Sequence, residues 1–124
     1  MEELELGEVQ LEFAELLWKT VPVPSGELVK ICKDAFGWKK PTTYTVLRKL
    51  CEKGIFKNEN GIVSAVISRE QFYAIRGERF VTETYGGSLP SFVASFASRK
   101  QLTAAEIEEL QKIIDRHKEA QNDG

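Results

Sequence analysis

The sequence predicts a mainly α-helical chain with one small β-hairpin, in two parts: residues 1–72 and residues 73–124. Two observations predict the first part, namely three helical patterns separated by proline or glycine and a hairpin pattern directly after them. A third observation, an unusually apolar C-terminal third, indicates a second part made of helices. At 124 residues the chain has room for a small domain with such an appendage.

Helical periodicity predicts two helices at the start of the chain, one over residues 7–19 and one over residues 25–36. In the first, the apolar residues that share one face are Val9, Phe13, Leu16 and Leu17. In the second, they are Leu28, Ile31, Cys32 and Ala35. Pro22 and Pro24 prevent the first helix from continuing, and Gly37 ends the second.

A third helix is predicted from Pro41 to Lys53, because proline suits the first helical turn and Gly54 suits the C-cap. Its inward residues are predicted to be Val46, Leu47 and Leu50. The other faces carry hydroxyls and cations. Two helices joined by a short turn, the second one polar on its outer face, are typical of a helix-turn-helix.

A hairpin is predicted next, with residues 55–58 and 62–67 as its two strands. Between them, Asn60-Gly61 supplies the positive φ angles of a tight turn. A hairpin placed directly after the polar helix corresponds to the wing of a winged helix-turn-helix, which predicts that residues 1–72 form a DNA-binding domain.

Charge is distributed unevenly, although the net charge is only −2. Residues 38–57 contain six basic residues and one acidic residue, which gives +5 there and leaves −7 elsewhere. Such a local basic patch can bind phosphates, because salt screens the distant charges. The predicted DNA contacts are Lys39, Lys40, Thr42, Thr43, Tyr44, Thr45, Arg48, Lys49 and Asn60.

The C-terminal part is predicted to contain two helices, which begin at capping boxes at Ser68–Gln71 and Thr103–Glu106. A short apolar segment is predicted between them, over residues 89–96. Its apolar surface is too large for about fifty residues, which favours pairing with a second copy. The predicted dimerisation residues are Phe80, Val81, Tyr85, Leu89, Phe92, Val93, Phe96, Ile107, Leu110, Ile113 and Ile114. The alternative is that these helices pack back on the winged domain.

Other classes of protein are disfavoured by the composition. No run approaches the eighteen apolar residues of a membrane span, and the acidic N-terminus is unlike a signal peptide, so we expect a cytoplasmic protein. Cys32 and Cys51 are expected to be reduced core residues. With one histidine, His117, and no nucleophile motif, we expect no enzyme activity, no cofactor and no metal. Trp38 is expected in the core, with DNA contact as the alternative.

Three motifs give the sequence a family resemblance. The motifs resemble, in order and spacing, those of the BlaI/MecI/CopY family of penicillinase repressors. They are residues 12–18, residues 38–54 (WKKPTTYTVLRKLCEKG) and residues 102–110 (LTAAEIEEL). The resemblance covers nearly the whole chain. It implies a homodimeric repressor that binds inverted-repeat operators in double-stranded DNA, with a role in β-lactam resistance or copper homeostasis.

The resemblance also assigns roles to individual residues. Thr42 and Thr45 match recognition-helix threonines and Lys49 matches a backbone-contacting position, whereas Pro41 and Tyr44 stand where the family often has long cations. We therefore expect a different operator sequence.

Derepression is the second point on which the chain departs from the family. The copper-binding cysteines of one branch are missing, since no cysteine follows Cys51. The bond cleaved by a signal-activated protease in the β-lactam branch corresponds to Ser95-Phe96, so the cleavage signal is altered.

The function predicted from the sequence is thus a dimeric transcriptional repressor, released from DNA by proteolysis or by another signal. The alternative is a winged-helix module that binds protein instead of DNA. Binding that weakens steeply with salt would distinguish the first from the second.

Overall fold

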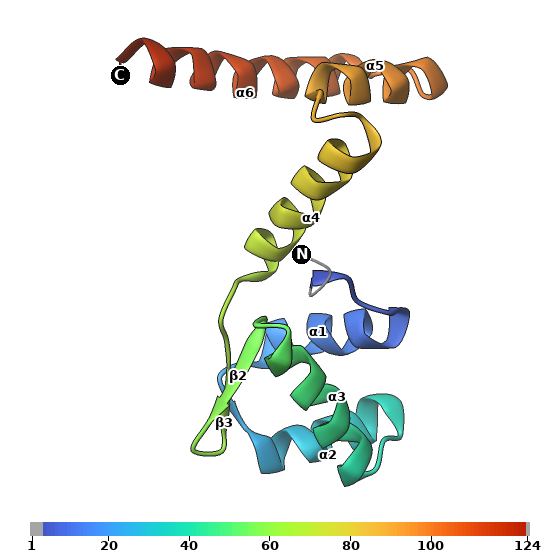
Figure 1. Ribbon diagram of the computed structural model, residues 1–124, viewed down its shortest axis with the longest axis vertical. Coiled ribbons are helices and arrows are strands. Elements are labelled where there is room, and N and C mark those ends of the chain that lie inside the picture. Colours follow the sequence, from blue (N-terminus) through green and yellow to red (C-terminus); the bar gives the residue numbers. More distant parts are fainter. Residues whose placement is uncertain (1–3, 124) are drawn as a thin grey trace. The chain divides into compact units, whose positions relative to one another are not determined.

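A computed structural model describes residues 4–123 and shows six α-helices and a three-stranded antiparallel sheet within them (Figure 1). The elements in chain order are α1 (Glu8–Thr20), β1 (Val23–Pro24), α2 (Ser25–Phe36), α3 (Lys40–Glu52), β2 (Phe56–Glu59), β3 (Ile62–Ala65), α4 (Arg69–Thr84), α5 (Leu89–Arg99) and α6 (Ala104–Asp123). The predicted class, mainly α with a small β-hairpin, is confirmed. Within the described residues, no helix is both long enough and apolar enough to cross a bilayer.

The chain divides into two compact units, the first ending at Arg79 and the second beginning at Phe80, so the division falls inside α4. The sequence places the domain boundary earlier, between residues 72 and 73. The physical reason for the difference is that the first turns of α4 pack on the first unit: Phe72 is fully buried in its core, and Arg79 forms an ion pair of 3.4 Å with Glu5. We call these units the winged unit and the C-terminal unit.

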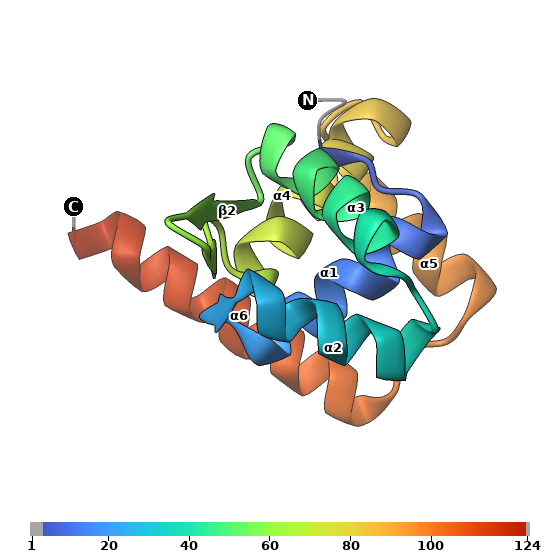
Figure 2. The same ribbon diagram turned by 90° about the horizontal axis from the view of Figure 1, so that it is seen from below.

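The winged unit has a core to which every one of its helices and both hairpin strands contribute. Its fully or almost fully buried side chains include Phe13, Leu17, Leu28, Cys32, Leu47, Leu50, Ile55, Phe56, Val63 and Phe72. α3 packs on α1 and α2, which brings the three helices together as Figure 2 shows. The predicted helices begin and end within about one residue of the observed ones, because proline, glycine and helical periodicity mark their ends.

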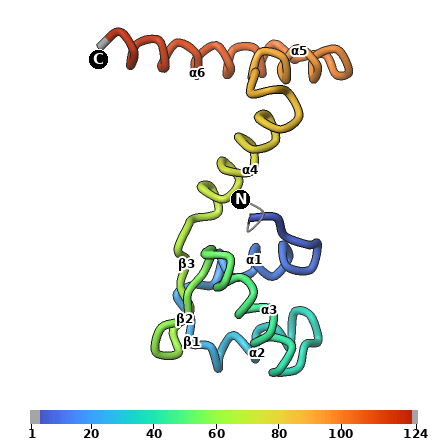
Figure 3. The backbone as a smooth tube through the Cα atoms, viewed as in Figure 1, coloured from blue at the N-terminus to red at the C-terminus, as the bar shows by residue number. Residues whose placement is uncertain are grey.

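The hairpin forms as predicted. Asn60 and Gly61 adopt positive φ angles of 53° and 79° between β2 and β3, which pair with Phe56 opposite Ala65. The sheet also has a third strand that was not predicted: β1 pairs with β3, with Val23 opposite Val63 (Figure 3). The two prolines of this segment indicate only a helix end, and pairing across forty residues leaves no local signal.

The beginning of α4 is held on α1 by several polar contacts. The Trp18 indole N–H donates to the Ile67 carbonyl at 3.1 Å, just before the helix. Arg69 Nε lies 2.8 Å from Glu15 Oε2, and the Tyr73 hydroxyl donates to Glu15 Oε1 at 2.6 Å. The Arg69 hydrogen bond, followed by that of Tyr73, lowers the pKa of Glu15. The predicted capping box is also present, since Ser68 N donates to Gln71 Oε1 and Gln71 N donates to Ser68 Oγ.

Two predicted inward residues of the winged unit lie outside its core. Val9 is 56% exposed, and Ala35 is exposed as well. Each lies in a terminal turn of its helix, where the helix extends past the elements on which it packs. Periodicity identifies a face but does not tell how much of the length of that face is covered.

The C-terminal unit consists of the end of α4 with α5 and α6. The sequence predicts only an apolar segment at α5, whereas the structure shows a helix whose N-cap Ser88 accepts a hydrogen bond from Ser91 N at 3.1 Å. The predicted capping box of α6 is confirmed, because Thr103 N donates to Glu106 Oε1 and Glu106 N donates to Thr103 Oγ1.

Candidate nucleic-acid interface

Helix α3 presents two opposite faces. Thr43, Leu47 and Leu50 are buried and hold the helix on the core. The face turned away from them is exposed and carries Thr42, Thr45, Arg48 and Lys49, with Lys39 and Lys40 at the N-terminal end. The structure therefore brings together six of the predicted contact residues along one accessible side of one helix.

The cations of this face are free to bind another molecule. Lys39, Lys40, Arg48 and Lys49 make no ion pair with any of the residues that the structure describes. Two other basic residues of the same segment are engaged within the protein: Lys53 Nζ donates to the Glu5 carbonyl at 2.7 Å, and Lys57 lies 3.5 Å from Glu59. We call the four unpaired cations, together with Thr42 and Thr45, the α3 surface.

Thr43 requires a correction. It is predicted as a DNA contact, but its side chain is fully buried and points into the core beside Cys32. The reason is its position four residues before Leu47, on the same face of the helix. Thr43 is therefore a core residue of the winged unit, and it is removed from the predicted interface.

Tyr44 lies at the edge of the α3 surface and is half-buried. Its hydroxyl donates to Ser25 Oγ at 3.1 Å, and Lys40 Nζ lies 6.0 Å from the centre of its ring. Beside the ring is a cleft of about 220 Å³, which Leu47, Arg48, Cys51 and the wing residue Asn58 also line. Tyr44 is predicted as a DNA contact, but its hydroxyl already has a partner within the protein.

The wing turn is exposed and stands near the beginning of α2. The Ser25 N–H donates to the Gly61 carbonyl at 2.8 Å, which ties the turn to the first residue of that helix. Asn60 is exposed at the tip, as a contact residue must be. The acidic Glu59 precedes it, so this turn lacks the positive charge of the α3 surface.

Trp38 and the two cysteines are associated with the core. The Trp38 ring is half-buried, with its centroid 4.7 Å from that of Phe36 and 5.5 Å from that of Phe13. Cys32 is buried, Cys51 is half-buried, and both are free thiols. Burial raises the pKa of both thiols.

A second surface lies on the C-terminal unit. No side chain from residue 80 to residue 122 is buried, although this segment is rich in apolar residues. The most exposed of its large apolar side chains are Phe80, Leu89, Phe96, Ile107, Leu110, Ile113 and Ile114. The other predicted dimerisation residues, Val81, Tyr85, Phe92 and Val93, are half-buried.

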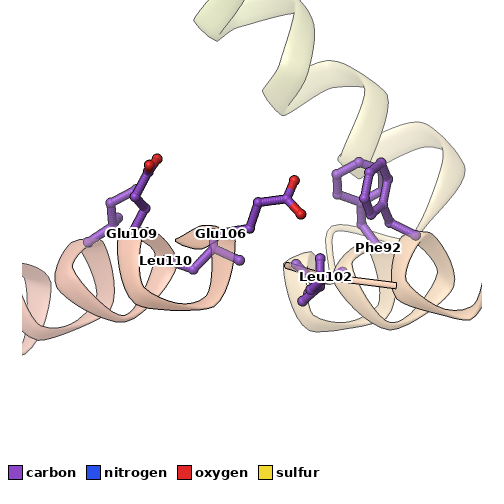
Figure 4. A pocket seen from close by; sticks show the side chains of 8 residues that line it. Phe92, Leu102, Glu106, Glu109 and Leu110 are labelled. Atoms are coloured by element: carbon purple, nitrogen blue, oxygen red, sulfur yellow. The ribbon is translucent and has the colours of Figure 1, made fainter. Parts of the chain in front are cut away.

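The aromatic side chains of this unit gather around Phe92. Its ring centroid lies 5.3 Å from that of Tyr85, 5.7 Å from that of Phe80 and 6.4 Å from that of Phe96. An apolar groove of about 310 Å³ runs between α5 and α6, lined by Phe92, Val93, Phe96, Leu102, Leu110 and Ile113 with Glu106 and Glu109 (Figure 4). Leu102 lines this groove but is not among the predicted dimerisation residues. Its place directly before the cap Thr103, where a hydrophobic staple residue stands, is the signal that would have identified it.

The predicted cleavage site lies in the middle of α5. The Ser95 hydroxyl accepts a hydrogen bond from the Tyr85 hydroxyl at 3.1 Å, and Phe96 is exposed. The peptide bond between Ser95 and Phe96 is therefore on the surface, but it is in helical conformation.

The chain was compared with known proteins. The profile of the penicillinase repressor family matches residues 6–116. The penicillinase repressor of Bacillus licheniformis is 25% identical over 118 residues, which cover 92% of each chain. The methicillin resistance regulatory protein MecI of Staphylococcus aureus is 22% identical over 116 residues, which cover 90% of this chain and 94% of that protein. Since the family profile spans most of its length, the chain belongs to the penicillinase repressor family and is a transcriptional repressor, not an enzyme.

Proposed function

We propose that two copies of this chain bind an inverted-repeat operator in double-stranded DNA, each copy placing α3 in the major groove. The α3 surface carries this proposal: two unpaired cations and two hydroxyls are exposed on the side of α3 that faces away from the core, and two more unpaired cations stand at its N-terminal end. Cations suit the phosphates that flank the groove, and hydroxyls hydrogen-bond to base edges or phosphates. The likeness to named repressors supports the same conclusion.

A second copy would complete the C-terminal unit. Fully burying a Leu, Ile or Phe side chain contributes about 1.5–3 kcal/mol, and association costs about 4–15 kcal/mol. The seven exposed apolar side chains of each copy are 37–59% exposed, so covering them on two copies would contribute about half of that value for each, roughly 10–20 kcal/mol in all. This contribution is comparable to the cost of association or larger than it. Two-fold pairing also delivers two copies of α3, as a palindromic operator requires.

The salt dependence of binding tests the DNA proposal. Four cations on each of two copies predict a slope of log K against log salt of up to about −7. Binding of the full chain to a pool of duplexes should therefore weaken by orders of magnitude between about 50 and 200 mM salt. Binding that does not respond to salt, or no binding, would favour the protein-binding module instead.

Single substitutions separate phosphate contacts from base contacts. Lys49→Ala should weaken binding to all duplexes alike and reduce the slope by about one for each copy, because it removes a phosphate contact. Thr45→Ala should instead change which duplexes are preferred. Lys112→Ala in α6, where Lys112 pairs with Glu108 at 3.7 Å, is the matched control and should leave the slope unchanged.

We propose further that derepression follows cleavage near Ser95-Phe96. Proteases bind their substrates as extended chains, so α5 must unwind locally before the bond can be cut. Because α5 has no buried side chain, its local unwinding requires little free energy. A fragment ending at Ser95, found by mass spectrometry in β-lactam-treated cells, would support this route. Operator release by the intact chain would refute it and indicate another signal.

A further inference from the structure

We propose that Ser25, a residue outside α3, is a positioning residue for base recognition: it holds the Tyr44 ring in one orientation and thereby sets the preferred operator sequence. The inference rests on the proposed DNA binding through α3. It adds a specificity-determining residue that lies in α2 and in none of the motifs of the chain that resemble the family.

Ser25 joins three elements at one point. Its backbone N–H donates to the Gly61 carbonyl of the wing turn, and its Oγ accepts the hydrogen bond from the Tyr44 hydroxyl of α3 at 3.1 Å. Ser25 is itself the first residue of α2. The far end of the Tyr44 side chain is thus attached to the same residue that anchors the wing.

The hydrogen bond matters because the Tyr44 ring has room to move. A cleft of about 220 Å³, which Arg48 and Asn58 also line, lies beside this half-buried side chain, so neighbouring atoms do not enclose it on every side. Lys40, at 6.0 Å from the ring centre, is too distant to hold it firmly. The Ser25 hydroxyl is the one polar group shown to hold the tip of this side chain among the described residues.

The fixed orientation decides what Tyr44 offers to DNA. With its hydroxyl engaged by Ser25, the side chain offers the ring, which can make apolar contact with a thymine methyl group in the major groove. Such a contact is strongest at about 3.5–4.0 Å between carbon atoms, so a change of rotamer removes it. Ser25 therefore acts on base preference through Tyr44 without touching a base.

The test is a selection from a random duplex pool with the full chain and with Ser25→Ala, Ser25→Thr, Tyr44→Phe and the Ser25→Ala/Tyr44→Phe double variant. Ser25→Ala and Tyr44→Phe each break the same hydrogen bond, so both should relax the same base pairs of each half-site. The expected loss of discrimination there is about threefold to tenfold, the equivalent of one hydrogen bond. The double variant should lose no more than either single variant, and Ser25→Thr, which keeps the hydroxyl, should select the wild-type consensus.

Tyr73→Phe is the matched control. It removes a tyrosine hydrogen bond of 2.6 Å from the same unit, but the bond joins α4 to α1 and does not involve α3. It should lower stability while leaving the consensus unchanged, which distinguishes positioning from general destabilisation.

Two results would overturn the inference while leaving the DNA proposal intact. One is a Ser25→Ala protein that selects the wild-type consensus at full discrimination. The other is a pair of single variants that relax different base pairs. A wild-type protein that enriches no duplex would overturn the DNA-binding proposal itself, and the positioning role with it.

Discussion

The winged unit and the C-terminal unit differ in how they bury their apolar side chains. The winged unit encloses Phe13, Leu17 and Phe72 completely, in a core formed by residues of α1, α2, α3, α4 and the sheet. The C-terminal unit has comparable apolar residues but buries none of them, and it exposes an apolar groove. One unit is thus stabilised by its own core, whereas the other lacks a core of its own. If two copies bind a palindromic operator as proposed, the first unit supplies the stability of each copy and the second unit supplies the contact between the copies.

The largest effect is expected from Phe92→Asp, which tests whether the C-terminal unit depends on a second copy. The Phe92 ring contacts three other aromatic rings of the C-terminal unit. An unpaired charge at this position would be buried when two copies associate, which costs several kcal/mol. We expect monomers by sedimentation and a loss of operator affinity of at least about a hundredfold. Ser91→Asp, in the exposed first turn of the same helix, is the matched control and should remain dimeric. A dimer of Phe92→Asp with native affinity would show that the apolar surface serves another purpose.

The next largest effect is expected from Phe13→Ala, which tests the independence of the winged unit. Emptying this fully buried site should lower the free energy of unfolding by about 3–5 kcal/mol, measured by chemical denaturation. The loss should be the same at every protein concentration, whereas the stability of the C-terminal unit should rise with concentration. Val9→Ala, at an exposed position of the same helix, should change the free energy by less than about 0.5 kcal/mol. A loss for Phe13→Ala that shrinks as concentration rises would mean that the winged unit also depends on a partner.

The smallest expected effect is the change in the stability of the winged unit at low pH. Arg69 and Tyr73 lower the pKa of Glu15, so this group stabilises the folded winged unit above the unfolded pKa of about 4.3 and ceases to do so as pH falls through its lower folded pKa. Glu15→Gln should therefore be slightly less stable than wild type at pH 7, and the difference should disappear toward pH 3. Denaturation midpoints at the two pH values provide the measurement. A difference that persists at the lower pH would assign the effect to packing instead of charge.

Much of the fold was predictable because its signals are local. The capping boxes at Ser68 and Thr103 close hydrogen bonds within three residues, and the Asn60-Gly61 turn needs only its own two residues. Helix α5 had a similar signal, since Ser88 is followed by Pro90 in the first turn. Its nearly continuous apolar run concealed the helical period, and the helix was missed.

The candidate interface was predictable in part. The cations and hydroxyls of α3 were identified from their spacing, and the four cations, with Thr42 and Thr45, are exposed on α3 or at its N-terminal end. Thr43 was assigned wrongly because it was grouped with the neighbouring hydroxyl residues, although its position four residues before Leu47 places it on the predicted inward face. The Tyr44–Ser25 hydrogen bond joins residues nineteen positions apart in different helices, so no local sequence pattern predicts it.

The sequence by itself determined where α1, α2, α3 and the hairpin begin and end, because caps, prolines and turns act within a few residues. Only the tertiary structure decided that β1 pairs with β3 and that the Tyr44 hydroxyl meets Ser25. The physical reason is that burial and pairing depend on which surfaces meet across the chain, and the free energy of those contacts belongs to no single segment.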